Sequence, residues 1–233
     1  MATELLVTGF VQSRGLHSKL VATLGELCER GEAFSLNEQV YTRGRRTGPV
    51  PAGETRIRVR SLRSYHQPTT WSLTVLHKPE PVRTSPLALQ YSVSEISVEQ
   101  GCRPDELVSA FGFERVSLSL TKEFELWKRG TKWERSGVSI VVYQLYPDDL
   151  TNEPLDPVTW IVQASIRFAQ PGPTPSQPPA GASGNGTGTR SSTPLGSSKP
   201  DTISGQEERD RSLAALERIK KALKGVVDLK RLE

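Results

Sequence analysis

Apolar and polar residues alternate along much of the chain, which is the pattern of β-strands that bury one face. Such runs are Glu4–Phe10, Phe34–Arg43, Thr55–Arg63, Trp71–His77, Ala88–Val98 and Val158–Phe168. Every even-numbered position from Val158 to Phe168 is apolar. We therefore expect the even-numbered face of this strand to fill an apolar interior. A change of parity near Ser94 predicts a β-bulge.

The stretch Phe111–Tyr146 predicts the centre of the sheet. It is rich in β-favouring residues, and the glycines at 130 and 137 predict two short turns. The run Val138–Leu145 is apolar on both faces. A strand of that kind is buried on two sides, so we expect it to have strand neighbours on both edges.

Three segments have helical spacing or helix-start signals. In Leu16–Arg30 the apolar residues recur three and four positions apart, and Gly31 follows where a C-terminal cap belongs. Pro104–Phe111 begins with favourable first-turn residues. Near the C-terminus, Ser204 and Glu207 have the spacing of a capping box, and an apolar stripe follows.

A change of composition divides the chain. Residues 170–205 are rich in Pro, Gly, Ser and Thr and poor in apolar residues, so they cannot bury enough surface to offset the entropy of ordering. We expect a β-barrel domain with an N-terminal helix at 1–169 and a flexible linker at 170–205. An amphipathic helix at 206–233 then docks on the barrel or on a partner.

These elements predict a mainly β (α+β) fold, an antiparallel β-barrel of about eight strands with flanking helices. A twisted open sheet with helices on one face is the alternative. The bulges favour the barrel because they bend a sheet towards closure.

Composition offers little chemistry. The formal net charge is +4 and the pI is about 9.1, which does not require a nucleic-acid partner. Two cysteines and three histidines are widely spaced, so we expect buried free thiols and no zinc site. No phosphate loop, dinucleotide glycine motif or nucleophile elbow occurs. The sequence therefore predicts no catalytic residue, cofactor or metal, and no stretch is apolar enough to span a membrane.

One motif keeps an enzymatic alternative open. Glu123 and Glu125 have the Glu-x-Glu spacing that resembles the metal-binding pairs of triphosphate-tunnel phosphohydrolases. Arg56, Arg58 and Arg60, which share one face of a predicted strand, are candidates for the opposing cations or for binding an anion or a partner. A second Glu-x-Glu pair is absent, so a solvated strand face is the favoured interpretation of Glu123 and Glu125.

The same arginines leave nucleic-acid binding as a further alternative function. Single-stranded nucleic acid is normally bound by cations interleaved with stacking aromatics, and Tyr65 is the one aromatic residue adjacent to this group. Direct binding of nucleic acid is therefore not the favoured reading.

Three segments resemble the Mediator subunit 18 family, in the family's order. Glu4–Cys28 is similar to the family's opening strand and first helix. Gly112–Tyr143, with Lys128-Arg129-Gly130 and VSIVVYQLY, is similar to its Gly-Phe, Arg-Lys-Gly and Val-Tyr segments. Leu223–Leu232, LKGVVDLKRL, resembles its closing tail, and the three together cover roughly a third of the chain.

The resemblance implies a β-barrel subunit of the Mediator head module, a nuclear and non-enzymatic adaptor that relays regulatory signals to RNA polymerase II. It implies a paired barrel, subunit 20, and a tethering helix from subunit 8 as partners. The first strand, Glu4–Phe10, and the turns that flank the central stretch are the expected contacts with the partner barrel.

Overall fold

The structure, a computed structural model, describes residues 2–28, 30–43, 56–64, 67–99, 102–116, 126–147, 151–169 and 204–232. The barrel strands are β1 (Ala2–Val11), β2 (Gly31–Arg43), β3 (Arg56–Ser64), β4 (Gln67–Leu76), β5 (Leu89–Val98), β7 (Leu126–Arg135), β8 (Val138–Tyr146) and β9 (Trp160–Ala169). The remaining elements are α1 (Arg14–Leu27), α2 (Pro104–Ala110), β6 (Phe113–Arg115) and α3 (Gly205–Leu223).

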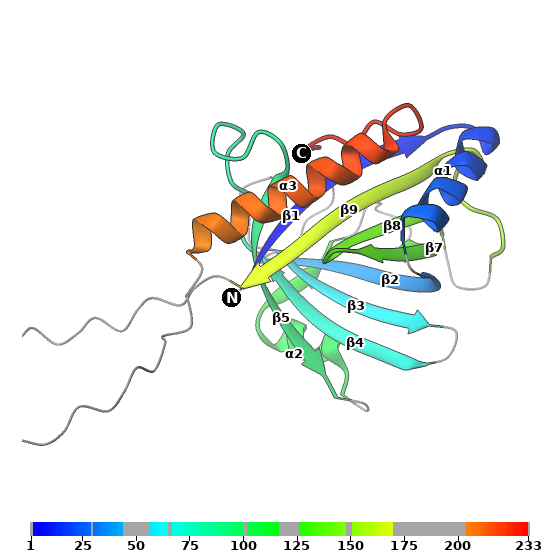
Figure 1. The fold of residues 1–233 in the computed structure, drawn as a ribbon. Coiled ribbons are helices and arrows are strands. Elements are labelled where there is room, and N and C mark those ends of the chain that lie inside the picture. Colours follow the sequence, from blue (N-terminus) through cyan, green and yellow to red (C-terminus); the bar gives the residue numbers. More distant parts are fainter. Residues whose placement is uncertain are drawn as a thin grey trace, which may run out of the picture.

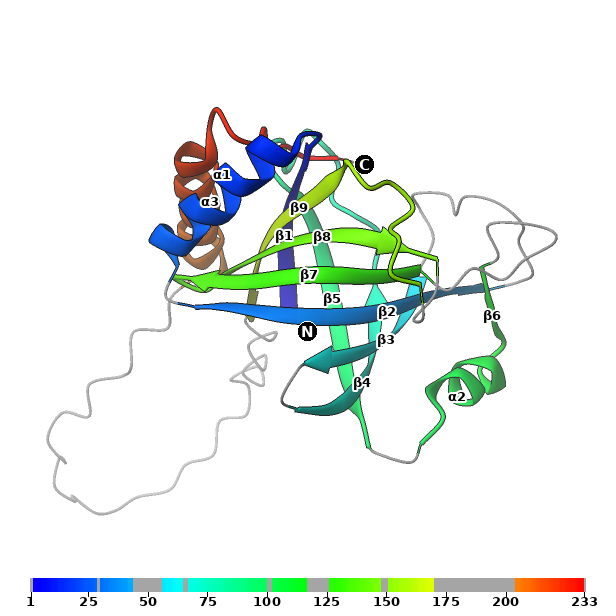
Figure 2. The ribbon, with the colours of Figure 1, turned by 90° about the vertical axis from the view of Figure 1, so that its right-hand side faces the viewer.

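Eight strands close into an antiparallel barrel in the order β3-β4-β5-β1-β9-β8-β7-β2, and a β2–β3 pairing completes the circle. β6 adds to the end of β2 outside this circle. Figures 1 and 2 show the barrel from two sides, with the helices on its outside. The predicted fold class is confirmed, and the open-sheet alternative is wrong because β2 and β3 pair.

The main hydrophobic core lies outside the barrel wall. Buried residues of α1, α3 and the tail after α3 pack with the outward side chains of β1, β8 and β9. A second, smaller cluster joins Val108 of α2 to Tyr41, Val59 and Leu73. α1 and α3 lie together on one side of the barrel, away from α2 (Figure 2).

The expected apolar interior is wrong. The even-numbered residues Val162 and Ala164 of β9 belong to the core beneath the helices, whereas Gln163, Ser165 and Arg167 face the lumen. Alternation shows that one face of a strand is buried, but it does not show which face. Here the helices bury the outer face, and the inner face is polar.

The central position of β8 is confirmed, because β8 pairs with β7 on one edge and β9 on the other. The turn at Gly137 is also confirmed, with a φ of 79°. The predicted turn at Gly130 is wrong. This residue lies within β7, opposite Phe34 and Tyr143, and a Cβ there would lie 1.9 Å from the carbonyl oxygen of Val142. Glycine is required here by a close approach of strands.

Three local predictions also fail. α1 ends at Leu27, and its cap is Cys28, whose N–H donates to the Leu24 carbonyl. Gly31 is not a cap but begins β2, against the ring of Trp133. β5 pairs with both neighbours without a shift, so no bulge occurs near Ser94. Neither cysteine is in a disulfide, but Cys102 is exposed rather than buried.

The C-terminal helix packs on the barrel of its own chain. Its capping box between Ser204 and Glu207 is present, and Leu216, Ile219 and Leu223 are buried against the barrel. Figure 1 shows α3 lying along β9 and β1. The predicted linker at 170–205 lies almost entirely outside the described residues.

Candidate functional site: a charged lumen

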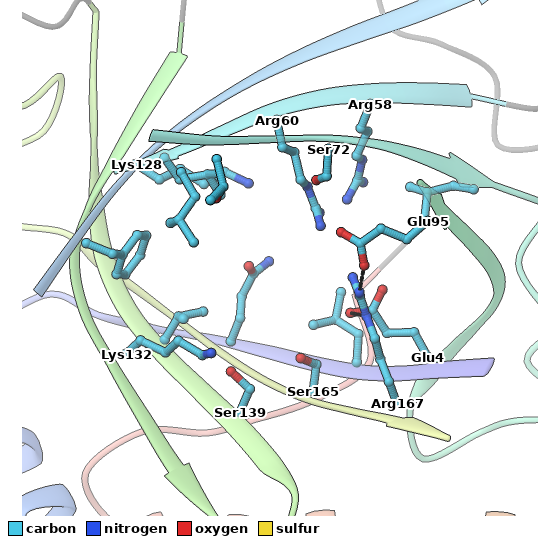
Figure 3. Close-up of a pocket in the computed structure, with 18 of the residues that line it drawn as sticks. Glu4, Arg58, Arg60, Ser72, Glu95, Lys128, Lys132, Ser139, Ser165 and Arg167 are labelled. Atoms are coloured by element: carbon cyan, nitrogen blue, oxygen red, sulfur yellow. Dashed lines mark hydrogen bonds and ion pairs between the residues drawn. The ribbon is translucent and has the colours of Figure 1, made fainter. Parts of the chain in front are cut away.

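The barrel encloses a cavity of about 810 Å³, lined by side chains from all eight of its strands. A cavity of this size is in the range that accommodates small-molecule ligands. Apolar side chains such as Leu6, Leu36 and Val141 contribute to the wall, but charged and hydroxyl groups project into the space between them (Figure 3). The charged residues of the lining are Glu4, Arg58, Arg60, Glu95, Lys128, Lys132 and Arg167.

Glu38 is the centre of one charge cluster in the barrel wall. Its carboxylate accepts hydrogen bonds from Arg60 Nε at 2.8 Å and from Lys128 Nζ at 3.3 Å. Arg58 Nε lies 3.7 Å from the same carboxylate. Three cations therefore surround one buried carboxylate, and the cluster carries a surplus of positive charge.

Strand register explains this convergence. Glu38 of β2 lies opposite Arg60 of β3 on one edge and opposite residue 126 of β7 on the other. Side chains two residues apart on a strand share a face, so Arg58 and Lys128 fall diagonally beside Glu38. The cluster thus follows from two pairings between segments distant in sequence.

The surrounding cations govern the ionisation of Glu38. Burial alone raises the pKa of a carboxyl group, but the charges of Lys128, Arg58 and Arg60 outweigh that effect and hold the pKa of Glu38 far below its usual value. Burial, assisted by the two arginines, lowers the pKa of Lys128 despite the attraction of Glu38. Burial also raises the pKa of Tyr143, which lines the same cavity.

A second cluster lies across the lumen. The Arg167 guanidinium donates to Glu4 at 3.2 Å and to Glu95, joining β9, β1 and β5 (Figure 3). Burial lowers the pKa of Arg167, but these two carboxylates outweigh that effect and raise it. The Arg167 cluster therefore carries a net negative charge, opposite in sign to the Glu38 cluster.

The structure brings together part of the predicted site. Arg58 and Arg60 face the lumen, and the charge of Arg56 acts on the lumen residue Tyr91. The side chains of Arg58 and Arg60 are only 23% and 20% exposed, so these two arginines do not lie on a solvent-exposed face. Glu123 and Glu125 lie outside the described residues.

Sequence reasoning missed Glu38, Lys128 and Arg167, together with Glu4 and Glu95, which pair with Arg167. No motif marks these residues, and their significance comes from strands that pair over long distances in the sequence. A single charged residue on the polar face of an alternating strand gives no signal of facing a lumen rather than solvent.

The described residues contain no cluster of three or more His, Cys, Asp or Glu side chains placed to hold a metal ion. The carboxylates of the lumen are instead engaged with cations. Within the same ranges, each helix is too short or too polar to cross a lipid bilayer.

No family model matches the sequence, and no curated protein does. Among solved structures, a chain from the Schizosaccharomyces pombe Mediator head module matches with a TM-score of 0.65 and 18% identity, covering 99% of this chain and 98% of that one. The PH1819 protein from Pyrococcus horikoshii OT3 matches with a TM-score of 0.55 and 14% identity, covering 99% and 94%. At these identities the likeness concerns the fold alone.

A putative adenylyl cyclase from Hippeastrum, described as having a dominant triphosphatase activity, matches with a TM-score of 0.42 and 10% identity. The matched region covers 71% of this chain and 80% of the Hippeastrum chain. This likeness is too weak to support an argument about function.

Proposed function

We propose that the protein is a non-enzymatic subunit of the Mediator head module, of the subunit 18 kind, and works in the nucleus as an adaptor towards RNA polymerase II. Its partners are a subunit 20 barrel and a helix of subunit 8. The observation that carries the proposal is the end-to-end match to a Mediator head chain, which spans 99% of this chain and 98% of the other.

The positions of the family-like segments support the same proposal. Glu4–Cys28 supplies Leu5, Leu20 and Leu24 to the main hydrophobic core. Gly112–Tyr143 adds Val138 and Ile140, and Leu223–Leu232 adds Leu223 and Val227. Three segments that lie far apart in sequence therefore meet in one cluster. The residues that resemble the family are those that pack the helices on the barrel, so they do not identify the partner interface.

The structure narrows the expected contact through the first strand, in which Phe10 is 49% exposed. β1 has strands on both edges, and Leu5 and Val7 are buried beneath the helices. The segments that flank the central stretch remain available. Phe111, after α2, is 69% exposed, and Leu155, after β8, is 55% exposed. Exposed large apolar side chains of this kind are typical of protein contacts.

Affinity purification tests the proposal. The tagged full-length chain is expressed in cells, recovered from nuclear extract, and the co-purifying proteins are identified by mass spectrometry. We expect Mediator head subunits, including subunits 20 and 8, in stoichiometric amounts. Recovery of the folded chain without any Mediator subunit contradicts the proposal.

A matched pair of variants locates the interface. Phe111→Asp places a charge at the proposed contact, and Ile96→Asp places one at an equally apolar position on β5 that is 58% exposed. We expect Phe111→Asp to lose subunit 20 and Ile96→Asp to keep it. Equal recovery with both variants rejects this contact while leaving membership of the complex intact.

A further inference from the structure

Among the described residues, one wall of the lumen carries more positive charge than its own carboxylates neutralise. Arg58, Arg60 and Lys128 lie on this wall, and Figure 3 shows Arg58 and Arg60 directed into the cavity, with Lys132 on a different side of the opening. Glu38 is the carboxylate shared by the first three. Lys132 pairs with Glu134 at 2.7 Å, but that carboxylate is 69% exposed, so water weakens the pairing.

Arg58 is the least satisfied of these cations. Its Nε is buried and has no hydrogen-bond partner among the described residues, and its ion pair with Glu38 spans 3.7 Å. A buried charged donor without an acceptor is costly in free energy. An anion that accepts a hydrogen bond from Arg58 Nε removes this cost and so gains affinity. Neutral groups that can hydrogen-bond a ligand line the same cavity, among them Ser72, Ser139 and Tyr143.

The opposite wall determines where in the lumen an anion can bind. Arg167 is already occupied by Glu4 and Glu95, so it offers no free charge, and the two carboxylates repel an anion. We propose that the lumen binds a small phosphate-bearing anion against the β3 wall, held by Arg58 and Arg60 with Lys128 beside them. This inference is independent of the Mediator proposal.

Phosphate fits this wall better than a carboxylate does. The guanidinium groups of Arg58 and Arg60 are planar forks that match tetrahedral oxyanions, and a multiply charged anion offsets several cations at once. The cavity of about 810 Å³ admits a small molecule within the barrel wall.

Isothermal titration calorimetry of the full-length protein with pyrophosphate, in a phosphate-free buffer with a chelator, tests the site. We expect saturable binding at low ionic strength that weakens as salt is added. Arg58→Gln and Arg60→Gln each remove one cation of this wall and should weaken binding by about tenfold or more. Lys19→Gln removes an exposed charge from α1 and should leave binding unchanged.

Glu38→Gln provides a test of opposite sign. Removal of the carboxylate frees Arg58, Arg60 and Lys128, so pyrophosphate should bind more tightly and raise the melting temperature more than in the unaltered protein. A residue with a purely structural role would not tighten binding when it is replaced. Titration with a nucleoside diphosphate distinguishes a nucleotide from a free polyphosphate as the source of the phosphate groups.

Two results overturn the proposal. One is the absence of pyrophosphate binding by the folded protein at low ionic strength. The other is binding that falls equally in Lys19→Gln and in Arg58→Gln, because that pattern describes attraction to the whole surface. Lys132 is 42% exposed, so Lys132→Gln should fold, and it should weaken binding less than Arg58→Gln because Lys132 lies on another side of the lumen.

Discussion

Thr8 and Lys230 exchange two backbone hydrogen bonds, each N–H donating to the other's carbonyl at 2.9 and 3.0 Å. Residues near opposite ends of the sequence are thereby joined as an antiparallel bridge. β5 pairs with β1 only as far as Leu6. The tail therefore takes up the edge of β1 that β5 leaves open, which removes an exposed strand edge.

Two arginines continue this attachment. Arg231 donates to the carbonyls of Ser85 and Glu80 (2.8 Å for Glu80), and Arg209 of α3 donates to the carbonyl of Thr84 at 2.8 Å. The segment between β4 and β5 is thus held from the C-terminal part of the chain. The attachment fixes α3 and the tail to the outside of the barrel.

Gly9→Ala should loosen the tail. A Cβ at position 9 would lie 2.6 Å from the carbonyl oxygen of Asp228 and 2.7 Å from Val227, so the tail must move away. Overpacking of this kind costs about 1–3 kcal/mol of unfolding free energy. We expect a lower melting temperature and faster proteolysis after α3. Gly25→Ala, in α1 with no neighbour within 4 Å, is the control and should be neutral or stabilising.

Leu223→Ala tests whether α3 stabilises the barrel. Leu223 is fully buried in the main core, and truncation of such a side chain costs about 2–5 kcal/mol. Urea unfolding should show this loss in a single transition shared by the helix and the barrel. Removal of all residues after 170 should be more severe, because it uncovers Leu5, Val7 and Ile140. A truncated chain with an unchanged melting temperature would show that the helix is not part of the folded body.

Most of the fold could be predicted from the sequence because the elements have local signals. Pro104 and the capping box at Ser204 mark helix starts, and the alternation from Val158 to Phe168 marks β9. The glycines were harder. A glycine at a turn and a glycine beneath a crossing chain look alike in sequence, which is why Gly130 was misplaced and Gly9 was not linked to Asp228.

The candidate site was predictable only in part, for a similar reason. Arg58 and Arg60 were found because they share a face of a single strand. Glu38, which pairs with them, and Lys128, which pairs with Glu38, lie 22 and 68 positions from Arg60 along the chain, and strand register brings them together. Whether that face lines a lumen depends on barrel closure and on the outer surface being covered by helices, and neither is encoded within β3.

Replacement of Glu38 with Ala should be strongly destabilising. The change leaves three cations in the barrel wall without their shared carboxylate, and loss of one partner from a buried ion pair costs about 3–5 kcal/mol. Glu134→Ala breaks the exposed pair with Lys132 and should cost about 1 kcal/mol or less. Chemical denaturation of both variants makes the comparison. Equal losses would mean that the Glu38 cluster is solvated.

Acid should weaken the barrel through Glu38. The pKa of this carboxyl is lowered in the folded protein from its ordinary value of 4.5, so the ionised form contributes stability that is fully present above that value. The contribution is lost progressively as the pH falls from 4.5 towards the folded pKa, because the unfolded chain then binds a proton at this carboxyl and the folded protein does not. Unfolding free energies measured from about pH 7 to about pH 3 should therefore fall more steeply for the unaltered protein than for Glu38→Gln, which has no proton to bind at this position. The gap between the two proteins should narrow towards the acid end. Parallel curves over this range would show that Glu38 is not held ionised by Arg58, Arg60 and Lys128.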